Sequence, residues 1–77
     1  MIEDEVMLPR SISNTDNIIA LEDWCSENIG PRARSRDHVD HEFNWYESSH
    51  FGHSVFYFAS KEDAVWFRLS FDFPTYR

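Results

Sequence analysis

The chain is poor in the residues that small folds use as cross-links or as flexible loops. Of its 77 residues one is a cysteine, Cys25, so no internal disulfide can form and no cysteine pair is there to bind a metal. Two are glycines, too few for a glycine-rich phosphate loop, and the G-x-S-x-G motif of serine hydrolases is missing. These absences argue against an enzyme, and a lone thiol fits a reducing cytoplasm.

Long apolar runs and basic residues are also scarce. No stretch approaches the roughly 18–20 apolar residues of a membrane span, and the first residues, MIEDEVM, lack the basic and apolar parts of a signal peptide. Fourteen acidic residues against seven basic ones give a net charge of −7. Because such a surface repels phosphate backbones, direct binding to nucleic acid is disfavoured. We expect a cytoplasmic protein with no membrane partner.

Aromatic side chains are plentiful and can build the core. They make up 17% of the residues, and each can bury roughly 150–250 Å², which suits a single small domain. Residues 1–14 mix acids with Pro9 and small polar residues without periodicity. We therefore expect a mobile or loosely docked acidic arm over residues 1–14 and one domain over residues 15–77.

A helix is expected over residues 15–29. Asn14 or Thr15 can cap its start, and Gly30-Pro31 ends it. Its apolar residues share one face, and they are Ile18, Leu21, Cys25 and Ile29. The opposite face carries what we call the acidic row, formed by Asp16, Asp23 and Glu27.

The second half of the chain predicts a sheet. The stretches HEFNWYE and SVFYFA alternate as strands around the turn SSHFGH, in which Gly52 is free to take a positive φ. Ser60 and Asp63 match a capping box, which predicts a short helical turn over residues 61–65. Over residues 65–73 every odd position is apolar, as is typical of a third, half-buried strand. A longer helix through Leu69 is the alternative.

These elements predict an α+β fold. One amphipathic helix packs on a three-stranded, mostly antiparallel sheet, in the order α-β-β-(short α)-β. Because one helix covers one face, the other face is expected to expose aromatic rings and a cation, which we call the open-face set: Tyr46, Tyr57, Trp66 and Arg68. Tyr, Trp and Arg are enriched at the centres of protein interfaces, so this set is a candidate partner-binding surface.

Two polar clusters suggest alternative functions. His38, His41, His50 and His53 suit a metal site by residue type, but a hairpin would hold the two pairs about 20 Å apart. Solvated histidines are therefore favoured, and no cofactor is expected. Three arginines, Arg32, Arg34 and Arg36, beside an aromatic sheet face would suit stacking of single-stranded RNA. The net charge opposes that second alternative.

The segments FYFASKEDAVWFRLSF (residues 56–71) and WCSENIGP (residues 24–31) resemble small accessory proteins of tailed phages. Many of those proteins have an apolar strand, a short acidic turn containing D-A, and a closing F-x-L-x-[FW]. The resemblance covers about half of the chain. It implies a protein without catalytic chemistry that binds a host polymerase, nuclease or defence complex in the host cytoplasm and changes its activity.

The sequence thus predicts a small acidic inhibitor or modulator that covers a surface of a host protein. The open-face set is one candidate surface and the acidic row is the other. Carboxylates in a row can imitate nucleic-acid phosphates and occupy a basic nucleic-acid-binding groove. A homodimer closed by the uncovered sheet face is a further alternative.

Overall fold

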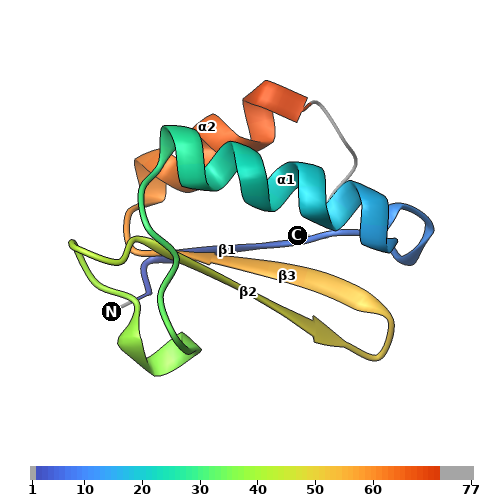
Figure 1. The fold of residues 1–77 in the computed structure, drawn as a ribbon, viewed down its shortest axis with the longest axis horizontal. Coiled ribbons are helices and arrows are strands. Elements are labelled where there is room, and N and C mark those ends of the chain that lie inside the picture. The colour runs from blue at the N-terminus through green and yellow to red at the C-terminus, as the bar shows by residue number, and fades with distance from the viewer. Residues whose placement is uncertain (1, 72–77) are drawn as a thin grey trace.

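Two helices lie on one face of a three-stranded antiparallel sheet (Figure 1), so the α+β prediction is confirmed. The computed structural model describes residues 2–71. The elements in chain order are strand β1 (Asp4–Met7), the short 3-10 helix η1 (Arg10–Ile12), helix α1 (Thr15–Asn28), the short 3-10 helix η2 (Arg36–His38), strands β2 (Trp45–His50) and β3 (His53–Phe58), and helix α2 (Lys61–Phe71). The order β1-β3-β2 places β3 in the centre of the sheet.

Helix α1 begins and ends where its caps predict. The side chain of Asn14 accepts a hydrogen bond from the backbone N–H of Asn17 at 3.0 Å. At the other end the N–H groups of Ile29 and Gly30 both donate to the carbonyl of Cys25. Gly30 has a φ of 147°, a value that side chains rarely allow. The prediction of this helix is confirmed.

The predicted hairpin is confirmed, but its first strand lies later than expected. This strand is Trp45–His50 rather than residues 41–47, and the turn is two residues rather than six. Strands β2 and β3 pair from Trp45 opposite Phe58 to His50 opposite His53. The two residues between them, Phe51 and Gly52, have φ values of 52° and 84°. A turn with two positive φ values matches the right-handed twist of paired strands, so it closes the hairpin tightly.

The N-terminal segment belongs to the sheet. We expected residues 1–14 to form a mobile or loosely docked arm, but residues 4–7 pair with β3 from Asp4 opposite Phe58 to Met7 opposite Val55. Val6 is the only buried residue of β1. A four-residue strand with one buried apolar side chain shows no apolar alternation, which explains why the sequence did not reveal it.

The prediction of a strand over residues 65–73 is wrong in its described part. Residues 61–71 form helix α2, which is long rather than the single turn expected there, and Phe73 lies outside the described residues. The Ser60 hydroxyl accepts a hydrogen bond from the N–H of Asp63 at 3.1 Å, so the predicted cap does start a helix. The edge of β3 that a third strand would need is taken by β1. The element order is therefore β-α-β-β-α.

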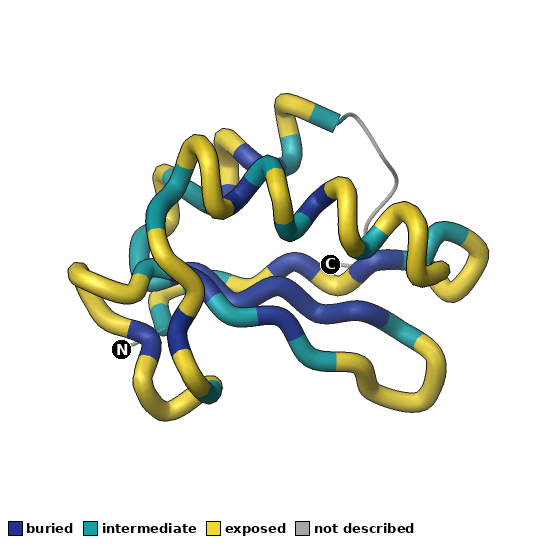
Figure 2. The backbone as a smooth tube through the Cα atoms, viewed as in Figure 1, coloured by how far each residue is buried: buried dark blue, intermediate teal, exposed yellow. Residues whose placement is uncertain are grey.

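The main core lies between the sheet and the two helices. Figure 2 shows buried residues along the strands, while the outward turns of the helices are exposed. The core cluster comprises Val6, Leu8, Leu21, Cys25, Trp45, Phe56, Phe58, Ala64 and Phe67. Phe67 of α2 lies at its centre, with ring centroids 4.8 Å from Phe56 and 5.2 Å from Phe58. Within the described range, neither helix has the length and apolarity needed to span a bilayer.

The other face of the sheet is covered by the segment between α1 and β2, which passes below the sheet in Figure 1. Ala33 and Val39 of this segment are buried, and the guanidinium of Arg36 lies 5.1 Å from the ring centre of Tyr57. Tyr57 is consequently only 4% exposed. The expected uncovered aromatic face does not exist, because the connecting segment, whose one helical element is the short η2, supplies a second cover.

Candidate functional site on the outer layer of the two helices

The open-face set does not form one surface. Tyr46 and Tyr57 stack on the far face of the sheet, with ring centroids 6.4 Å apart and an interplanar angle of 20°. Trp66 and Arg68 lie on α2, across the sheet from them. The expectation that these four residues share a face is wrong, because it required residues 65–71 to be a strand.

Arg68 joins α2 to β1. Its Nη1 donates to Oδ2 of Asp4 at 3.2 Å, and its Nη2 donates to the backbone oxygen of Glu5 at 3.1 Å. Its Nε is buried without a hydrogen-bond partner. The guanidinium is therefore committed to the fold and is not a free cation for a ligand.

The tyrosines on the far face are already covered by arginines of the same chain. Arg32 lies 5.1 Å from the ring centre of Tyr46, and Arg36 lies over Tyr57. The Tyr57 hydroxyl is 3.3 Å from Nε2 of His50, and burial raises the pKa of that hydroxyl. The ring faces that RNA bases would need for stacking are thus occupied, which weakens the RNA hypothesis.

The histidines are held apart by separate partners. Nδ1 of His38 is 2.6 Å from the Ser35 hydroxyl, and Nδ1 of His53 is 3.1 Å from the backbone oxygen of Leu8. Within residues 2–71, no three histidine, cysteine or acidic side chains are grouped so that they could hold a metal ion. Cys25 is fully buried in the core, and burial raises the pKa of its thiol, so it is not poised as a nucleophile.

Two glutamates and an arginine form a polar cluster that the sequence did not reveal. Nη1 of Arg32 donates to Oε2 of Glu22 in α1 at 2.6 Å, and its Nη2 donates to the backbone oxygen of Glu47 in β2. The buried Glu47 side chain accepts a hydrogen bond from the Ser54 hydroxyl at 2.8 Å. Burial raises the pKa of Glu22, and the positive charge of Arg32, which lowers it, offsets only part of this effect. Both carboxylates are held by groups of the protein, so the cluster ties α1 to β2.

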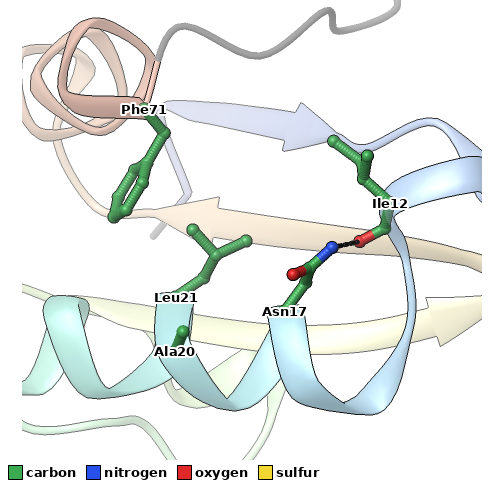
Figure 3. Close-up of a pocket in the computed structure, with 5 residues that line it drawn as sticks. All are labelled: Ile12, Asn17, Ala20, Leu21 and Phe71. Carbon is green, nitrogen blue, oxygen red and sulfur yellow. Dashed lines mark hydrogen bonds between the residues drawn. The ribbon is translucent and has the colours of Figure 1, made fainter.

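An apolar cavity of about 260 Å³ lies between η1, α1 and the end of α2 (Figure 3). It is lined by Ile12, Asn17, Ala20, Leu21 and Phe71. The only side-chain amide there, that of Asn17, donates to the backbone oxygen of Ile12 at 3.2 Å. No lining residue titrates, so this cavity offers no acid–base chemistry. Its lining combines residues 12–21 with Phe71, which lies about fifty residues further along the chain, and this is why no local pattern predicts it.

The outward side of α2 exposes three large apolar residues, which we call the α2 patch: Val65, Trp66 and Leu69. They are 42%, 46% and 76% exposed. Together with Lys61 and Glu62 they line a shallow groove of about 450 Å³. A solvent-facing helix side is normally polar, so a cluster of this kind marks a candidate binding surface.

Trp66 is held in place by α1. Its ring centroid lies 5.1 Å from that of Trp24, edge to face at 73°. The Trp24 ring also packs edge-on against Phe71 at 5.3 Å. Because its ring rests on a packed neighbour, Trp66 presents a surface whose shape exists before any partner arrives.

The acidic row lies on the outward side of α1, next to the side from which Trp24 contacts Trp66 of α2. At about 100° per residue, Asp16, Asp23 and Glu27 all project within roughly 60–100° of Trp24, on the side away from the buried Leu21 and Cys25. All three carboxylates are exposed. The part of the chain that is described contains three salt bridges, and none involves these residues. The outer layer of the two helices is therefore acidic along α1 and apolar along α2.

A scan against models of protein families, a search of curated proteins and a search of solved structures found no match to this chain.

Proposed function

We propose that this chain is a small acidic binding protein without catalytic activity, which modulates another protein by covering part of its surface. Its contact surface is the outer layer of the two helices, formed by the α2 patch and the acidic row. The resemblance to phage accessory proteins favours a host polymerase, nuclease or defence complex as the target, inhibited in the cytoplasm of the host cell.

The observation that carries this proposal is the exposure of Trp66 and Leu69 on a helix whose other side buries Ala64 and Phe67. Tryptophan is among the residues most enriched at the energetic centres of interfaces. It has two rotatable side-chain bonds, so its ordering on binding costs little entropy. The contact with Trp24 lowers that cost further, because the ring already has a fixed neighbour.

The acidic row supports the same conclusion through long-range attraction. Carboxylates that form no salt bridge within residues 2–71 raise the rate at which a basic partner associates. They also fit a target whose basic groove normally holds nucleic acid. In that case affinity falls steeply as salt rises, because the exposed charges are screened over about 10 Å at 0.1 M salt.

Capture from a bacterial lysate, read by mass spectrometry, tests the proposal. The test variant is Leu69→Glu, which changes a 76%-exposed side chain and leaves the core intact. The matched control is Phe51→Glu, which places the same charge at the hairpin tip, where Phe51 is 92% exposed. We expect the wild type and the Phe51 variant to retain the same target and the Leu69 variant to lose it. Retention of the target by Leu69→Glu would refute the α2 patch as the contact surface.

A further inference from the structure

We infer that the partner segment occupying this surface is a basic amphipathic α-helix. This inference deepens the proposed function and rests on it. It specifies the chemistry of the partner: an apolar stripe that contacts the α2 patch, with lysine or arginine side chains on the flank that faces the acidic row.

Charge excludes the other occupants of such an apolar surface. Asp16, Asp23 and Glu27 form no salt bridge within residues 2–71, and the chain carries a net charge of −7. A second copy would bring a second acidic row into the contact, while nucleic acid or an anionic membrane would bring phosphates. Like charges placed together in an interface are strongly unfavourable. Lys61 and Glu62 lie together at one end of the groove, where their charges offset each other.

The sheet edges make strand addition a poor alternative. At the β2 edge, the N–H of Ala33 donates to the backbone oxygen of Trp45 at 2.8 Å, and Arg32 forms a parallel bridge with Trp45. At the β1 edge, the guanidinium of Arg68 donates to the backbone oxygen of Glu5. An added strand would have to break these contacts. The exposed apolar side chains lie on a helix instead, and a helix partner can pack on them through side chains alone.

The dimensions suit about three turns of helix. With a rise of about 1.5 Å per residue, the acidic row from Asp16 to Glu27 extends over about 16 Å. The α2 patch from Val65 to Leu69 extends over about 6 Å by the same measure. A partner helix that lies between the two stripes can pack apolar side chains against Trp66 and still place basic residues along the row.

Two labelled peptides of about 18 residues, made only of leucine and lysine, test the inference against the full chain. In one peptide the leucines are spaced three and four residues apart, so that they share one face of a helix. In the other peptide leucine and lysine alternate. Both peptides contain the same number of each residue, so their composition and charge are equal. Binding is followed by fluorescence anisotropy, and helix formation by circular dichroism. We expect the helical-period peptide to bind at least about tenfold more tightly and to gain helicity on binding.

Variants locate the contact. Leu69→Glu adds a negative charge, so binding driven by charge alone would strengthen, whereas packing on the α2 patch predicts a loss of about tenfold or more. Asp23→Lys should weaken binding and flatten its dependence on salt. The control Phe51→Glu adds the same charge far from the surface, so its affinity for the peptide should stay close to that of the wild type.

Equal binding of the two peptides, or undiminished binding by Leu69→Glu, would overturn the helix inference. A failure of the helix inference can be distinguished from a failure of the proposed function. If the peptides show no preference while Leu69→Glu still loses its target from the lysate, the surface binds a partner of another shape. If Leu69→Glu keeps that target, the proposed contact surface itself is wrong.

Discussion

Truncation of Phe67, compared with truncation of Val65 and of Leu69, tests the helical structure of residues 61–71. Only in a helix is Phe67 buried while Val65 and Leu69 face solvent. The ring of Phe67 is fully buried among Phe56, Phe58, Phe71 and Trp24, at centroid distances of 4.8, 5.2, 5.5 and 5.8 Å. Replacing a buried phenylalanine by alanine costs about 3–5 kcal/mol. A domain of this size has roughly 4–12 kcal/mol of stability in total, so Phe67→Ala should lose a large fraction of it.

Val65→Ala and Leu69→Ala are the matched controls on the same helix. Leu69 is 76% exposed, so its truncation loses about a quarter of the roughly 2 kcal/mol that full burial provides, or about 0.5 kcal/mol. In a strand, Val65, Phe67 and Leu69 would share one buried face and their truncations would all be costly. Urea unfolding followed by circular dichroism gives the three free energies. Costs for the controls as large as that of Phe67→Ala would refute the helix, and a cost for Phe67→Ala as small as theirs would refute the buried position of Phe67.

Three further predictions concern the contacts around the core. Arg68→Ala removes the hydrogen bonds to Asp4 and Glu5 and should lower the free energy of unfolding by about 1–3 kcal/mol, with faster amide exchange in β1; unchanged exchange would contradict this link. Burial raises the pKa of Glu22 above 4.5, so the native state binds this proton more tightly and its stabilising effect is lost as pH rises through the native pKa. The difference in free energy of unfolding between the wild type and Glu22→Gln should therefore fall as pH rises above 4.5. A rise in this difference would show that folding lowers the pKa of Glu22. The thiol of Cys25 should resist Ellman's reagent in the native protein and react in denaturant, so rapid native labelling would mean that the core opens there.

Local signals were enough to predict α1 and the hairpin. Asn14 and Gly30 mark the ends of α1 through hydrogen bonds made within a few residues of each other. Alternation and Gly52 do the same for the hairpin. In both cases the groups that decide the structure are neighbours in the sequence, so their spacing can be read directly.

The features that were missed depend on contacts between distant segments. Strand β1 has one buried residue, Val6, and pairs with a strand about fifty residues further along the chain. The cover over the far sheet face comes from Arg36 lying on Tyr57, and an arginine in a charged loop gives no periodic signal. Because the tertiary partner decides these positions, single-sequence patterns did not place the acidic row and Trp66 on the same surface.

Helix α2 was mistaken for a strand because its pattern fits both structures. Apolar residues at positions 65, 67, 69 and 71 alternate as in a strand, yet they also form two pairs spaced four apart. In a helix, Phe67 and Phe71 then share one side, while Val65 and Leu69 share the opposite side. The capping box at Ser60 was the local signal that favoured the helix, and it was correct.

The two pairs of apolar residues on opposite sides of α2 also support the proposed function. A helix packed on one side needs one apolar stripe, and Phe67 with Ala64 supplies it; α2 carries a second stripe that faces solvent. By the estimate above, Leu69 contributes only about 0.5 kcal/mol to folding, so stability does not account for a large apolar residue there. The proposed contact with a partner would account for it. Stability and binding should therefore separate on this helix: Phe67 variants change the free energy of unfolding, while Leu69 variants change affinity at nearly constant stability.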